Sequence, residues 1–102
     1  MDQIEELRQE ALADAIETVG APSEADLVAL YAPGTFGCHE ALHVTSVAMD
    51  MVDGHVLEHP AIVANAEWFR LAAEAHGALF ALYQAISDVH LPAMGGDATN
   101  EE

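Results

Sequence analysis

The chain begins with apolar residues that recur every three or four positions, which is the period of one helix face. In residues 2–19 this stripe contains Ile4, Leu7, Ala11, Ala15 and Val19. Asp2 can accept a hydrogen bond at the helix start, and Gly20 suits the left-handed residue that ends many helices. The pattern therefore predicts a first amphipathic helix over residues 2–19.

Two further helices are predicted before the midpoint of the chain. Ser23 is a suitable cap for a short helix over residues 24–32. A long helix is predicted over residues 36–59, because Pro60 disfavours a helical conformation in the residue before it. The Asp53–Gly54 pair weakens this segment, so the sequence leaves open whether the helix is continuous there.

The strongest helical pattern starts at the N-cap candidate Asn65 and ends near Leu91. In one stripe, apolar residues repeat every seven positions, and further apolar residues lie between them. This stripe contains Trp68, Ala72, Ala75, Leu79, Leu82, Ile86 and Val89. A second stripe beside it contains Phe69, Ala73, His76, Phe80 and Tyr83. A helix with so narrow a polar strip is expected to be central in a bundle or shared with a partner chain.

No segment alternates apolar and polar residues as a strand does, so the predicted fold is all-α. We expect a small helical bundle of three main helices and one short helix, which dimerises through the third main helix. Residues 1–92 are predicted to form a single domain. Residues 93–102 lack periodicity and apolar content, and are predicted to form a disordered acidic tail.

The chain of 102 residues is strongly acidic. It contains 18 Asp and Glu residues but only two arginines, Arg8 and Arg70, and no lysine. Nucleic acid and anionic membranes attract basic surfaces, so neither is an expected partner, whereas a basic protein would suit this charge. Cys38 is the only cysteine, which rules out an intrachain disulfide and favours a reducing compartment. The first residues have no signal-peptide pattern, and a cytoplasmic location is predicted.

Residues 39–43 read His-Glu-Ala-Leu-His, which is an H-E-x-x-H pattern. Histidines four positions apart lie on one face of a helix, as two ligands of one metal ion require. The segment resembles the zincin peptidase signature, and this resemblance implies zinc ligands at His39 and His43 and a catalytic Glu40. It is confined to the motif, because the longer metzincin pattern has Gly and His where this chain has Ser46 and Met49.

A third ligand would come from the facing helix of a hairpin. If residues 60–64 form the turn, positions whose numbers sum to roughly 124 lie level across the two long helices. His90 then lies within about two turns of His39, and Asp88 comes near it as well. The sequence predicts a candidate site for a divalent metal such as zinc at His39, His43, Asp88 and His90. The alternative is that no cofactor binds and that these residues form a polar helix face.

Residues 55–59 read His-Val-Leu-Glu-His, the inverted form of the same signature. In a continuous helix the two motifs lie roughly 24 Å and 160° apart, so they cannot share one ion. We interpret His55 and His59 as partly buried packing residues, with His59 also favourable at the negative end of the helix. His76, followed by Gly77, is interpreted as a core or interface histidine where helices approach closely.

The leading functional hypothesis is a small, acidic interaction or regulatory protein without enzymatic activity, present as a homodimer. One alternative is a helical-bundle metal protein with hydrolytic chemistry at Glu40. Another is a nucleic-acid mimic that binds a basic protein through rows of carboxylates. The acidic row to which this last hypothesis points contains Glu5, Glu6, Glu10, Asp14 and Glu17.

Overall fold

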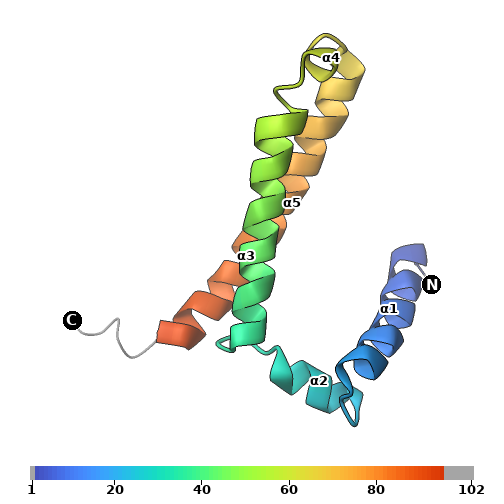
Figure 1. The fold of residues 1–102 in the computed structure, drawn as a ribbon, viewed down its shortest axis with the longest axis vertical. Helices are drawn as coiled ribbons and strands as arrows, with labels where there is room; N and C mark the ends of the chain where they lie inside the picture. Colours follow the sequence, from blue (N-terminus) through green and yellow to red (C-terminus); the bar gives the residue numbers. More distant parts are fainter. Residues whose placement is uncertain (1, 96–102) are drawn as a thin grey trace. The chain divides into compact units, whose positions relative to one another are not determined.

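The computed structural model describes residues 2–95, and these residues are all-α, without strands (Figure 1). The chain divides into two compact units, Met1–Ala32 and Pro33–Glu102. No helix within residues 2–95 combines the length and the apolar character that crossing a membrane requires. The predicted all-α class is therefore confirmed, and the predicted tail from residue 96 onward lies outside the described residues.

Helix α1 spans Gln3–Val19, as its apolar period predicts. Asp2 caps it by accepting a hydrogen bond from the N–H of Ile4, at 2.9 Å. At the other end Gly20 has a φ of 79°, the left-handed conformation that glycine adopts without a steric penalty. Both predicted ends of this helix are confirmed.

The second helix of the first unit, α2, spans Glu24–Leu30 and is two residues shorter than the predicted 24–32. The hydroxyl of Ser23 accepts a hydrogen bond from the N–H of Asp26, at 3.3 Å. The same hydroxyl donates a hydrogen bond to the Asp26 carboxylate at 2.8 Å, so Ser23 and Asp26 are joined by two hydrogen bonds at the helix start. The predicted cap at Ser23 is thus present.

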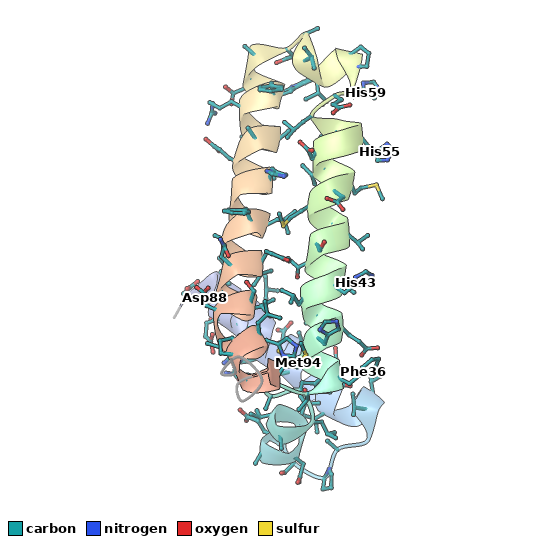
Figure 2. All side chains as sticks on the ribbon, turned by 90° about the vertical axis from the view of Figure 1, so that its left-hand side faces the viewer. Phe36, His43, His55, His59, Asp88 and Met94 are labelled. Atoms are coloured by element: carbon teal, nitrogen blue, oxygen red, sulfur yellow. The ribbon has the colours of Figure 1, made fainter. Side chains whose placement is uncertain are left out.

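The second unit is a helical hairpin, in which α3, Phe36–Met51, lies antiparallel to α5, Ala66–Gly95 (Figures 1 and 2). Thr35 caps α3, since its hydroxyl accepts a hydrogen bond from the N–H of Cys38 at 3.2 Å. Asn65 caps α5 in the same way and accepts from the N–H of Trp68 at 3.0 Å, as predicted. Both long helices therefore begin at a side-chain cap.

The predicted helix 36–59 is not one α-helix. After α3 the chain forms a π-helix, η1, over Val52–Val56, and the Asp53–Gly54 pair lies inside it. The N–H of Leu57 donates to the carbonyl of Val52 at 2.8 Å, five residues back, which closes the wide turn. The helix therefore widens into a π turn at the Asp53–Gly54 pair, and it ends shortly after this turn.

A short helix that the sequence analysis did not predict, α4, spans Pro60–Val63. Proline suits a first helical turn, because its missing N–H would have no partner there. Nδ1 of His59 accepts a hydrogen bond from the N–H of Ala61 at 3.1 Å and caps α4. The interpretation of His59 as a cation at a helix C-terminus is therefore wrong, because this residue begins the next helix.

Helix α5 continues past its predicted end at Leu91 and contains Pro92. Proline inside a helix removes one hydrogen bond and normally destabilises it. The following turn packs closely, since a Cβ built on Gly34 would lie 3.2 Å from the Cβ of Ala93. Gly34 also has a φ of 93°, so this contact requires glycine. Residues 93–95, predicted as tail, are helical instead.

The hairpin buries little apolar surface. Leu42, 6% exposed, is the only hydrophobic residue in the described part of the chain that is buried. Thr45, Ser87 and His90 are the buried polar residues. The hydroxyls of Thr45 and Ser87 donate to carbonyls of their own helices, so neither is left unpaired. The fully buried positions between α3 and α5 are therefore mostly polar.

Both arginines of the chain form ion pairs within their own helices. Arg8 lies 2.6 Å from Glu5 in α1, and Arg70 lies 2.6 Å from Glu67 and 2.5 Å from Glu74 in α5. The hydrogen bond from Arg8 lowers the pKa of Glu5 to about 2. Whatever stability this pair contributes is present above the ordinary carboxyl pKa and is lost as the pH falls through the lowered value. Such exposed pairs stabilise a helix only slightly.

Candidate functional site

The most specific side-chain cluster lies at the open end of the hairpin, around His90 near the end of α5. Its ring is fully buried, with 0% exposure. The N–H of Gly34 donates to Nδ1 of His90 at 2.9 Å. Nε2 of His90 lies 3.3 Å from Nδ1 of His39, and the two ring centroids are 5.4 Å apart. The predicted proximity of His39 and His90 is confirmed.

For neutral imidazole rings, these contacts determine which nitrogen of each ring carries the proton. A backbone N–H donates, so Nδ1 of His90 presents its lone pair to Gly34 and the ring proton is on Nε2. That proton points at Nδ1 of His39, which accepts it. The proton of His39 is therefore on its own Nε2.

The histidine pair is less suited to a metal ion than the sequence suggests. A metal binds histidine through a nitrogen lone pair, but one nitrogen of His90 carries a proton and the other accepts from Gly34. Asp88 is exposed on α5, and Figure 2 shows it on the opposite side of the hairpin from His43. Within residues 2–95 no group of three or more His, Cys, Asp or Glu side chains could hold a metal ion. The metal site stays a prediction without a ligand set.

His43 and Glu40, the other residues of the H-E-x-x-H segment, are exposed on α3. His43 lines a small open cavity of about 160 Å³ with His39, Leu42, Ser46 and Tyr83. No carboxylate lines this cavity, since Glu40 is not among its lining residues. Glu40 instead lines a larger open cavity of about 670 Å³, together with both histidines of the motif. The catalytic role that the zincin resemblance implies for Glu40 stays a prediction, because no set of three metal ligands is present within residues 2–95.

The interpretation of His55 and His59 as partly buried packing residues is wrong, because both side chains are exposed. In Figure 2 both lie on the outer side of the hairpin, away from α5. The widened turn of η1 and the early end of the helix explain the difference, since the prediction assumed one continuous α-helix to residue 59.

His76 is half-buried on α5, which agrees with its interpretation as a core or interface histidine. Gly77 next to it is exposed, and a Cβ built there would meet no atom within 4 Å. The close helix contact predicted at this glycine is therefore not made within the described residues.

Some positions of the apolar stripes of α5 are half-buried and others are exposed. Ala72, Leu79 and Ile86 are half-buried. The exposed positions that follow alternating steps of three and four residues are Trp68, Leu71, Ala75, Ala78, Leu82, Ala85 and Val89. We call these seven residues the α5 seam. The repeat from Trp68 to Val89 was predictable from the sequence. Leu71, Ala78 and Ala85 were not predicted to share its face.

Comparison of the chain with protein-family models, with curated proteins and with solved structures found no match.

Proposed function

We propose that this chain is a non-enzymatic interaction protein and that its α5 seam binds a second copy of the chain. The observation that carries this proposal is the run of seven exposed apolar positions in coiled-coil spacing. A helix with this spacing buries its seam against another helix, each side chain inserting between side chains of the partner. The hairpin uses a different side of α5 for α3 and leaves the seam exposed.

The charge distribution supports self-association at this surface. The chain has 18 acidic residues and a net charge of −16, yet none of the seven seam positions is charged. Two copies can therefore meet along the seam without burying a carboxylate, whose unpaired burial would be strongly unfavourable. The only basic side chain of α5, Arg70, lies off the seam and is paired within its own helix.

The seam supplies a large part, but not all, of the area that an interface needs. Trp68, Leu71, Leu82 and Val89 are each between 48% and 54% exposed. The exposed half of a large side chain is on the order of 100 Å², and three alanines add to these four. A standard interface buries roughly 800 Å² per partner. Further apolar surface is exposed on α3, for example at Val44.

The small number of fully buried residues in the hairpin also supports binding of a second copy. Leu42 is the only hydrophobic residue in the described part that is fully buried, and the other apolar residues of the hairpin keep part of their surface exposed. In proteins, helices gain most of their stability from packing an amphipathic face against other elements. A second hairpin would supply that packing and complete a four-helix bundle.

Replacing Leu82 with aspartate is expected to dissociate the dimer. The change places an unpaired charge in the middle of the seam in both copies, and we expect the dissociation constant to rise by about 100-fold or more. Sedimentation equilibrium measures this directly, because the dimer has twice the chain mass of 10.8 kDa.

The matched control is Phe80→Asp. Phe80 is 49% exposed and Leu82 is 48% exposed, and the two lie on one helix. Helix geometry places Phe80 nearly opposite the seam, so this variant should keep the wild-type mass. A monomeric wild-type chain, or equal dissociation by both variants, would contradict the proposal.

Raising the NaCl concentration from about 0.01 M to about 1 M is expected to tighten the dimer. It shortens the screening length from about 30 Å to about 3 Å. Because each copy has a net charge of −16, screening reduces their mutual repulsion. We expect the dissociation constant to fall roughly tenfold. Binding to a basic partner would respond in the opposite direction, so sedimentation across this range also distinguishes the two kinds of partner.

The metal-protein and nucleic-acid-mimic hypotheses stay predictions, because no observation in residues 2–95 favours either. The metal hypothesis lacks a ligand set. In the acidic row of α1, Glu5 is already engaged by Arg8.

A further inference from the structure

We propose that the two α5 seams pair antiparallel, with Ala78 of one copy opposite Leu82 of the other. This inference rests on the proposed function, because it specifies how two copies meet through the seam. In this register, opposing residues have numbers that sum to about 160. The paired segments run from Trp68 to beyond Val89, a length of roughly 33 Å.

The position of α3 relative to the seam favours the antiparallel orientation. At about 100° per residue, the seam lies roughly a quarter-turn around α5 from the half-buried positions Ala72, Leu79 and Ile86. In an antiparallel pair the two-fold axis is perpendicular to the helices, so both copies of α3 lie on the same side of the paired α5 helices. Four helices can then close into a bundle. A parallel pair would place the two copies of α3 on opposite sides and leave the bundle open.

The exposed surface of α3 fits such a closed bundle. Helix geometry places Ala41 and Val44 on the side of the hairpin that also carries the seam. Val44 is 63% exposed, and Ala41 is exposed beside it. In the antiparallel arrangement this side of α3 is turned toward the α3 helix of the other copy, whereas the carboxylate of Glu40 stays on the outer side of α3.

The sizes of the seam residues also favour this arrangement. A parallel, in-register pair would stack each residue on itself, so the bulky layer at Leu71 would be followed directly by two alanine layers, at Ala75 and Ala78. Helix separations differ by about 2 Å between small and large contacts, so two neighbouring alanine layers would leave a gap. In the antiparallel register each central layer instead combines one alanine, Ala78, with one leucine, Leu82.

The remaining layers of this register are also balanced. Leu71 of one copy is opposite Val89 of the other, so two branched side chains of similar size meet. Ala75 is opposite Ala85, a small layer that lies between two larger ones. Shifting the pairing by one heptad would place Leu71 opposite Leu82 and Ala75 opposite Ala78, leaving Val89 outside the paired segment. The register with a sum of about 160 therefore buries more of the seam.

Cysteine pairing tests the orientation and the register in the full chain. Cys38 is first replaced by serine, and Leu71→Cys, Val89→Cys and Leu82→Cys are each made in that background. Each variant is oxidised alone, and the Leu71→Cys chain is also oxidised after refolding together with either of the other two. A disulfide forms only when the two Cβ atoms come within about 4.5 Å, so non-reducing electrophoresis reports which positions meet.

We expect the mixture of Leu71→Cys and Val89→Cys to yield several-fold more covalent dimer than either variant alone or the Leu71→Cys and Leu82→Cys mixture. Sedimentation of the reduced variants shows whether dimers are present in every case. Dimers in which each variant cross-links with itself would overturn the antiparallel orientation. Stronger cross-linking in the Leu82→Cys mixture, or none in any mixture, would overturn the register. In these cases the proposed function stands; monomers throughout would contradict the proposed function itself.

Discussion

A chain in which alanine replaces His90 is expected to lose about 3 kcal/mol of its free energy of unfolding. The imidazole is fully buried, so its removal leaves a cavity between the end of α5 and the segment before α3. The N–H of Gly34 also loses its acceptor, and the loss of one intramolecular hydrogen bond costs about 1 kcal/mol. His39 loses a donor as well, but its ring is exposed and can turn to water.

Urea unfolding, followed by circular dichroism at one protein concentration, measures this loss. His90→Asn is the informative companion, because an asparagine side-chain oxygen can occupy the position of Nδ1 and accept from Gly34. We expect it to retain part of the lost stability. His39→Ala should cost only about 1 kcal/mol. If His90→Ala and His39→Ala lowered the free energy of unfolding equally, the buried ring of His90 would not be the main stabilising group of this pair.

Replacing Leu42 with alanine should destabilise the hairpin by about 3 kcal/mol, within the range usual for a buried leucine. This side chain is 6% exposed and is the only buried hydrophobic one in the described part of the chain. The loss would be a large fraction of the total stability of a small domain.

Val47→Ala is the matched control, because Val47 lies on the same helix but is 47% exposed. We expect it to change the free energy of unfolding by less than about 0.5 kcal/mol. Both variants are measured by urea unfolding at equal concentration. If they destabilised the chain equally, the buried contact at Leu42 would not be what holds α3 to α5.

The sequence was sufficient to locate most helix ends, because those ends depend on local chemistry. Asp2, Ser23 and Asn65 cap helices through their own side chains, and Gly20 ends α1 through its left-handed backbone. The helix at Pro60 was missed, since the proline was interpreted only as the end of the helix before it. Proline both ends one helix and begins the next at this position.

The inward faces of the helices were harder to predict. Apolar residues make up 52% of the chain, so several faces of α3 and α5 are apolar enough to be buried. Only the partner helix decides between them, and periodicity does not reveal that partner. Trp68 and Leu82 are exposed for this reason, although their repeat is the clearest in the sequence. If a second copy covers them, the repeat predicted a contact between chains.

The histidine site was predicted in part. The predicted hairpin turn at residues 60–64 placed His39 and His90 near each other. In that hairpin, residues of the two helices lie level when their numbers sum to roughly 124. The observed contact pairs 39 with 90, a shift of five, because the connection continues through α4 to the cap at Asn65. The hydrogen bond from Gly34 to His90 was not predictable from residue spacing, because its donor is a backbone N–H and its acceptor is a side chain 56 residues away.

The π-helix at Val52–Val56 also determines how this chain can tolerate changes of length. A π turn holds one more residue than an α turn, so it can absorb an insertion without rotating the helix before it. Leu42 and His39 belong to α3, whose contacts with α5 lie upstream of the wide turn. In evolutionary terms, the Asp53–Gly54 region is the place in the hairpin where a single residue can be gained or lost while the contacts at its open end keep their alignment.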